Sequence, residues 1–156
     1  MIGLPSLADL EVISIAGLTC GVLDISCTLT LMKLKGTAPM RLLQAVASGI
    51  LGPKSFAGGR GTAALGLGIH FFIAFAASAA YYLASRTLSV LNEHAVVCGL
   101  FYGVAVHLFM TFVVLPLSAL KRPFSMTAFA TQFAVHMFFV GLPISLTVRH
   151  FACGLR

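Results

Sequence analysis

The chain has 156 residues, of which 59% are hydrophobic and only 9% charged, and its mean hydropathy is +1.02. This composition excludes an ordinary soluble domain and is typical of an integral membrane protein. The formal net charge is +6, but the basic residues lie between apolar stretches rather than along one face, so we expect no nucleic-acid partner.

The first apolar stretch, residues 12–34, is long enough to cross a bilayer core as a helix. Small and polar residues recur along it at three- and four-residue spacing and therefore share one face. These residues are Gly17, Cys20, Gly21, Asp24 and Thr28. Because a carboxyl group that faces lipid is costly, we expect Asp24 to point inward. The simpler alternative is a protonated Asp24 that only bonds Thr28 or a neighbouring helix.

Residues 38–51 predict a short helix that begins with a capping threonine and an early proline. Its apolar residues, Leu42, Leu43, Val46 and Ile50, fall on one side, and Arg41, Gln44 and Ser48 fall on the other. The segment is too short to span a bilayer, so the prediction is an amphipathic helix lying at the membrane surface.

The glycine-rich turn GPKSFAGGRG follows, and it carries Lys54 and Arg60. Backbone amides and two basic side chains in such a turn could hold a phosphate, either of a lipid headgroup or of a ligand. The spacing required of a Walker motif is absent. A flexible basic turn before the second span is the simpler interpretation.

Three further apolar stretches, 62–83, 95–117 and 127–148, are also long enough to span. Each has a histidine near its middle, namely His70, His107 and His136. In the third stretch, helical spacing puts Gly99, Gly103, His107 and Thr111 on one face. In the fourth, it puts Gln132, His136, Phe139 and Pro143 on one face.

The predicted fold is therefore all-α: a single membrane domain, residues 1–156, built as a four-transmembrane-helix bundle with one interfacial helix between the first two spans. The first and third connections hold seven basic residues, Lys33, Lys35, Arg41, Lys54, Arg60, Lys121 and Arg122. The ends and the second connection hold three, Arg86, Arg149 and Arg156. This imbalance predicts that both termini lie outside and that the amphipathic helix lies in the cytoplasm.

The four ionisable groups, Asp24, His70, His107 and His136, fall at a similar depth, roughly 12–15 Å from the predicted cytoplasmic edge. We therefore predict a shared site. Three imidazoles and a carboxylate suit a transition metal such as zinc or iron, and two histidines across a bundle suit a b-type haem equally well. Gln132 is placed to hold the second ring nitrogen of His136, and Thr28 and Thr111 lie one turn from Asp24 and His107.

Two other interpretations of these groups remain open. Aspartate and histidine inside a bundle are also the groups that proton-coupled transporters use, although four spans are few for a transporter unless it forms a homo-oligomer. Alternatively, the groups only join helices in a structural or assembly subunit of a larger membrane complex, each pair contributing roughly 0.6–2 kcal/mol. No catalytic residue is assigned, and whether the protein is an enzyme is left open.

Four cysteines, Cys20, Cys27, Cys98 and Cys153, show no C-x-x-C pair and no zinc spacing. They are therefore interpreted as small apolar packing residues. Cys98 and Cys153 fall near the same predicted membrane face, where a disulfide between them is the alternative.

The stretches LLQAVASGILGPKSFAGG, IHFFIAFAASAAYYLASR, FYGVAVHLFMTFVVLPLSA and HMFFVGLPIS resemble a group of small, uncharacterised bacterial four-span membrane proteins. The resemblance covers most of the chain after Met40. It implies a location in the bacterial inner membrane and implies no activity.

Overall fold

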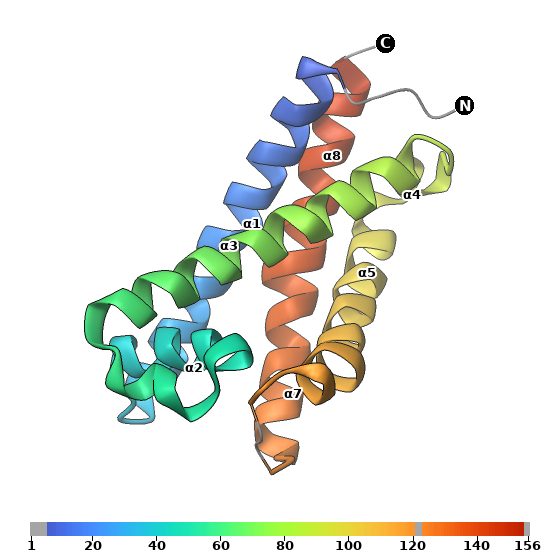
Figure 1. The fold of residues 1–156 in the computed structure, drawn as a ribbon. Coiled ribbons are helices and arrows are strands. Elements are labelled where there is room, and N and C mark those ends of the chain that lie inside the picture. Colours follow the sequence, from blue (N-terminus) through green and yellow to red (C-terminus); the bar gives the residue numbers. More distant parts are fainter. Residues whose placement is uncertain (1–5, 121–122, 155–156) are drawn as a thin grey trace.

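The computed structural model describes residues 6–120 and 123–154, with side chains as far as Phe151, and within these residues every regular element is a helix. The elements are α1 (Leu7–Leu34), α2 (Pro39–Leu51), η1 (Gly52–Ala57), α3 (Gly59–Ser85), α4 (Val90–Glu93), α5 (Ala95–Phe109), η2 (Met110–Val114), α6 (Leu115–Leu117), α7 (Met126–Val135), η3 (His136–Gly141) and α8 (Leu142–Gly154). They form a bundle in which the start of α1 and the end of α8 lie at one end, and α2 lies at the other (Figure 1).

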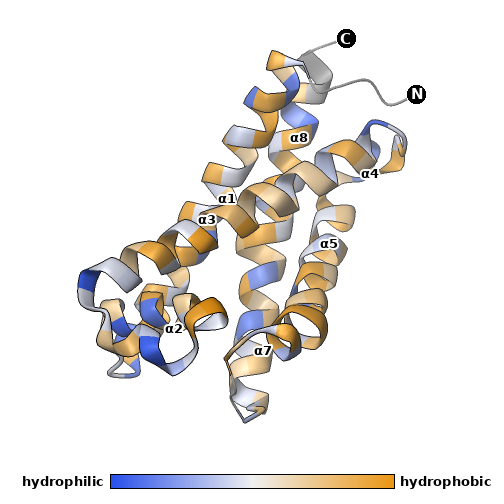
Figure 2. Cartoon of the chain, in the orientation of Figure 1, coloured by the Kyte–Doolittle hydropathy of each residue, from blue (hydrophilic) through white to orange (hydrophobic). Residues whose placement is uncertain are grey.

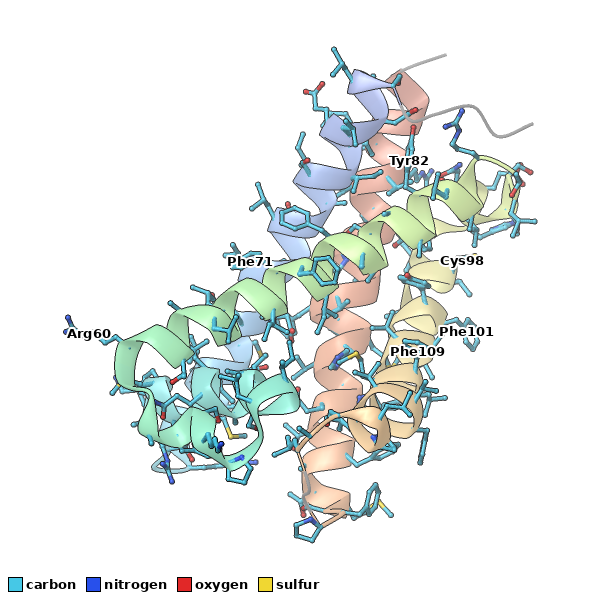
Figure 3. All side chains as sticks on the ribbon, in the orientation of Figure 1. Arg60, Phe71, Tyr82, Cys98, Phe101 and Phe109 are labelled. Carbon is cyan, nitrogen blue, oxygen red and sulfur yellow. The ribbon has the colours of Figure 1, made fainter. Side chains whose placement is uncertain are left out.

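Four helical stretches in the described part of the chain are long and apolar enough to cross a membrane: Leu7–Leu34, Gly59–Ser85, Ala95–Leu117 and Met126–Phe151. They coincide with the four predicted spans and extend most of them by several residues. Hydrophobic residues dominate these helices, and hydrophilic residues gather toward their ends and at the α2 end of the bundle (Figure 2). Figure 3 shows Phe101 and Phe109 projecting away from the bundle, and both are more than half exposed.

α1 begins at Leu7, earlier than the apolar pattern indicates, because Ser6 and Asp9 form a capping box. The Asp9 amide donates to Ser6 Oγ at 3.2 Å, and the Ser6 amide donates to Asp9 Oδ2 at 2.7 Å. Asp9 also ties α1 to the end of α3, since it accepts hydrogen bonds from the Tyr82 hydroxyl and from Arg86 Nη1, the latter at 3.3 Å. Tyr82 and Arg86 lie 73 and 77 residues from Asp9 along the chain, so local sequence patterns do not predict these two contacts.

The hydrophobic core occupies the half of the bundle near the termini. Its buried side chains come from α1, α3, η3 and α8, and the largest fully buried ones are Tyr81, Ile144, Val12 and Val148. Toward α2 the helices diverge (Figure 1). That divergence makes room for the cavity described below.

The small-residue faces of the first and third spans point inward, as predicted. Gly17, Cys20, Gly21 and Thr28 are buried in α1, and Gly99, Gly103 and His107 are buried in α5. Two of the glycines permit direct backbone contact. A Cβ at Gly103 would lie 2.7 Å from Met137 Cα in η3, and one at Gly66 would lie 2.8 Å from the Leu43 carbonyl carbon in α2. A methyl group at either place would force the two helices apart.

The predicted face of the fourth span is only partly correct. Gln132 and His136 do share a side, but the buried series then continues through Val140, Gly141, Ile144, Ser145 and Val148 instead of Phe139 and Pro143. The cause is the π-helical turn η3, which begins at His136 and adds a residue to the turn. The inward face therefore moves one position along the chain.

α2 forms where the sequence predicts it, but of its predicted polar side only Arg41 is exposed. Gln44 and Ser48 are buried, and Gln44 Nε2 donates to the Gly59 carbonyl at 3.0 Å at the start of α3. The apolar side, including Leu42, Val46 and Ile50, instead lines the cavity. α2 thus attaches to α3 through polar contacts and presents an apolar wall to the interior.

Candidate functional site

A cavity of about 920 Å³ lies in the half of the bundle near α2. This volume falls within the roughly 300–1,000 Å³ of typical ligand pockets. All four residues predicted to form a shared site line it: Asp24, His70, His107 and His136. Most of the remaining wall is apolar, and its residues come mainly from α1, α2, α3, η2, α6, α7 and the segment that follows α6.

The cavity reaches the surface of the bundle near α2, α6 and the segment that follows α6. Ile50, Leu115 and Phe124 line it and are also well exposed, with 65%, 44% and 63% of their surfaces accessible. One backbone hydrogen bond crosses this side, from the Ala119 amide to the Gly49 carbonyl at 2.8 Å. A molecule of modest size therefore has a route in from the outside of the bundle.

Asp24 and His70 form the first pair of ionisable groups. His70 Nε2 lies 2.9 Å from the Gly21 carbonyl, and His70 Nδ1 lies 3.8 Å from Asp24 Oδ2. A carbonyl can only accept, so the Nε2 nitrogen carries the hydrogen and Nδ1 presents its lone pair to the carboxyl group. The two side chains are only 13% and 16% exposed. Together they can hold one shared proton, on Nδ1 or on the carboxylate.

His107 and His136 form the second pair, with ring centroids 5.1 Å apart. His136 Nδ1 donates to the Gln132 carbonyl at 2.8 Å, which leaves the lone pair on Nε2. His107 is 3% exposed, and its Nε2 is buried without a hydrogen-bond partner among the described residues. This pair can bind a proton, a hydrogen-bonding ligand or a metal ion.

Aromatic rings surround the second pair. The centroids of Phe129 and Phe133 lie 4.7 and 5.8 Å from the His107 ring. Neither phenylalanine was among the residues predicted from the sequence to form the site. Their helical spacing from His136, seven and three residues, was the available signal, but ordinary packing residues show the same spacing.

Of the three residues predicted to support the site, two bond its ionisable groups and the third lines the cavity. Thr28 Oγ1 donates to Asp24 Oδ1 at 3.5 Å, and Thr111 lines the cavity. Gln132 does hold the second ring nitrogen of His136, but through its backbone carbonyl instead of its side chain. Its side-chain Oε1 is buried without a partner among the described residues.

The four predicted metal ligands lie on one cavity as two separate pairs. Within the part of the chain that the structure describes, no group of three or more His, Cys, Asp or Glu side chains is arranged to hold a metal ion. The pairing follows from helix contacts, since α1 packs against α3 while α5 packs against η3. Binding of a metal ion or haem by these residues stays a prediction.

Two other predicted features lie away from the cavity. Lys54 in η1 and Arg60 in the first turn of α3 are both exposed, and Figure 3 shows Arg60 at the far end of α3. Phosphate binding by these two residues stays a prediction. Cys20 and Cys27 are free thiols. The side chain of Cys153 lies outside the described residues, so its pairing with Cys98 stays a prediction.

Comparison of the chain with protein-family models, with curated proteins and with solved structures finds no match. The resemblance to small bacterial four-span proteins is therefore not tested by these comparisons. What the protein does has to be argued from the cavity itself.

Proposed function

We propose that the four candidate spans cross the inner membrane of a bacterium, with both termini outside and α2 in the cytoplasm. Three observations support this proposal: the length and hydropathy of the spans, the many large hydrophobic side chains on the outer surface, and the excess of basic residues at the α2 end. The bacterial membrane follows from the resemblance noted above.

The topology predicts a labelling pattern. In a variant whose own cysteines are replaced by serine, we expect Val90→Cys to react with a membrane-impermeant maleimide in intact cells and Lys54→Cys to react only after lysis. Both positions are exposed, so burial would not obscure the result. The opposite pattern would reverse the assigned orientation.

For the cavity, we propose proton-coupled movement of a small solute. The supporting observation is that two protonatable pairs, Asp24–His70 and His107–His136, come from all four spans and line one cavity that opens outward. Imidazoles ordinarily titrate near pH 6.5, and such groups inside a bundle are typical of proton pathways. Solute and protons would share the same space, which couples their movements.

The test uses purified protein in liposomes that contain a pH-sensitive dye. A panel of solutes is added outside: tetraphenylphosphonium and ethidium as cations, benzoate as an anion and glycerol as a neutral molecule. We expect at least one to change the internal pH with the wild-type protein and to lose most of that effect with Asp24→Asn, because the variant cannot form the shared-proton pair.

The matched control is Glu11→Gln, which removes an exposed carboxylate of α1 that does not line the cavity. This variant should behave as the wild type does. If no solute moves protons, or if Asp24→Asn and the wild type respond alike, the proposed function is wrong.

Metal or haem binding is the second candidate, and the unpartnered, buried Nε2 of His107 beside His136 favours it. Elemental analysis and an absorption spectrum of the same purified protein test it. Stoichiometric zinc or iron, or a Soret band, lost in both His107→Ala and His136→Ala, would establish this alternative. If neither a cofactor nor proton movement is found, the ionisable groups only join helices, as in a structural or assembly subunit, and each substitution only lowers stability.

A further inference from the structure

We infer that the solute is a hydrophobic organic cation, which the cavity exchanges for a proton held by Asp24 and His70. The inference rests on the proposed function and names its substrate class. Its starting point is the charge of the cavity. Among the described residues that line it, Asp24 is the one carboxylate, and none is Lys or Arg.

Several hydrogen-bonding groups of the cavity are acceptors. His70 Nδ1 and His136 Nε2 present lone pairs, because their other ring nitrogens donate to backbone carbonyls. Gln132 Oε1 is a buried acceptor without a partner among the described residues. With Asp24 ionised, these groups favour a ligand that carries positive charge and disfavour a carboxylate or phosphate.

The apolar walls of the cavity suit the hydrophobic body of an organic cation. Ile69, Ile73, Val106 and Val140 line the cavity, together with Phe112, Phe124 and Phe129. Apolar side chains accommodate a hydrophobic body, and aromatic faces attract cations. A strongly hydrated ion such as sodium would gain little from these walls.

Charge balance explains the exchange. The Asp24–His70 pair has a net charge of −1 when it holds no shared proton and 0 when it holds one. A monovalent cation neutralises the first state, whereas the second state leaves the cation without a counter-charge in an apolar environment, which is costly. One proton therefore enters the pair as one cation leaves, and the net charge of the cavity stays constant.

The other titratable groups that face this site also weaken cation binding when they gain a proton. Among the described residues of the cavity wall, the other ionisable side chains are His107 of α5, His136 of η3 and the Cys20 thiol of α1, and none comes from α2 or α7. Cys27 lies one turn from Asp24 on α1. When acid protonates the histidines, their positive charges repel a bound cation. Cation binding should therefore weaken as the pH falls.

The test compares two probes of nearly the same shape and opposite charge, tetraphenylphosphonium and tetraphenylborate, by equilibrium dialysis against detergent-purified protein. At pH 8 we expect the wild type to bind the cation and to reject the anion. Lowering the pH to 5.5, or introducing Asp24→Asn, should weaken cation binding by at least about tenfold, because each removes the net negative charge. Asp24→Glu keeps the charge and should keep binding, which separates the role of charge from any effect on folding.

In the liposome assay, about one proton should leave the dye compartment for each tetraphenylphosphonium cation that the protein carries in, and Glu11→Gln should not change this ratio. Cation binding that is equal in wild type and Asp24→Asn would overturn the inference. If benzoate or glycerol instead drives Asp24-dependent proton movement, the substrate class is wrong while the proposed function stands. If no solute moves protons, both are wrong.

Discussion

Substitution of Gly103 by alanine should lower the free energy of unfolding by ~1–3 kcal/mol, the usual range for overpacking a well-packed site. The added methyl would lie 2.7 Å from Met137 Cα and 2.8 Å from the His136 carbonyl carbon. These are backbone atoms of η3, which cannot rotate away as a side chain can. α5 would have to separate from η3, and the His107 and His136 rings would move apart with them.

Unfolding by sodium dodecyl sulfate in mixed micelles, followed by circular dichroism, measures the loss. Gly68→Ala is the matched control, because this glycine is exposed in α3 and an added Cβ would meet nothing within 4 Å. Alanine is the better helix former, so the control should be unchanged or slightly stabilised. Equal stability of Gly103→Ala and the wild type would mean that α5 and η3 do not pack as closely as described.

Substitution of Gly66 by alanine should detach α2 from α3 and open the cavity. The new Cβ would lie 2.8 Å from the Leu43 carbonyl carbon and 3.2 Å from the Ala47 amide nitrogen. Since the contact is again with backbone, we expect a loss of ~1–3 kcal/mol in the same unfolding assay. A cysteine placed at Val46, on the cavity side of α2, should react faster with a maleimide in this variant than in the otherwise wild-type chain.

Gly61→Ala is the control for this second substitution. Gly61 lies near the start of the same helix and has open space where a Cβ would be. It should leave both the stability and the labelling rate close to those of the wild type. Slow labelling at position 46 in the Gly66 variant would show that α2 tolerates the methyl group and keeps its place.

In the candidate site, the inward-facing positions of the ionisable groups could be predicted from the sequence, but their pairing could not. Helical spacing places Asp24 and His107 on the small-residue faces of their helices, and both faces do point inward. The same spacing does not say which helices touch. The structure pairs Asp24 with His70 and His107 with His136, because close glycine contacts bring α5 against η3 and α1 against α3.

For α2, likewise, the bounds of the helix could be predicted from the sequence, but the side that packs against protein could not. Its bounds agree with the sequence prediction to within a residue, because a proline starts the helix and a glycine with φ of +61° ends it. Its two-sided pattern alone cannot tell which side meets protein. Gln44 is buried because it finds the Gly59 carbonyl and Thr62 as partners, whereas Arg41 on the same side stays exposed, and the apolar side faces the cavity.

The sequence by itself determined the all-helical fold, the places of the four apolar spans and the inward faces of the first and third. These follow from composition, hydrophobic length and helical periodicity, which are local properties of the chain. The tertiary structure alone decided the shift at the π-helical turn η3, the ties from Asp9 to Tyr82 and Arg86, and the cavity that joins the two ionisable pairs. Each of these depends on how helices distant in sequence cross and rotate against one another, and contacts between their backbones set that geometry.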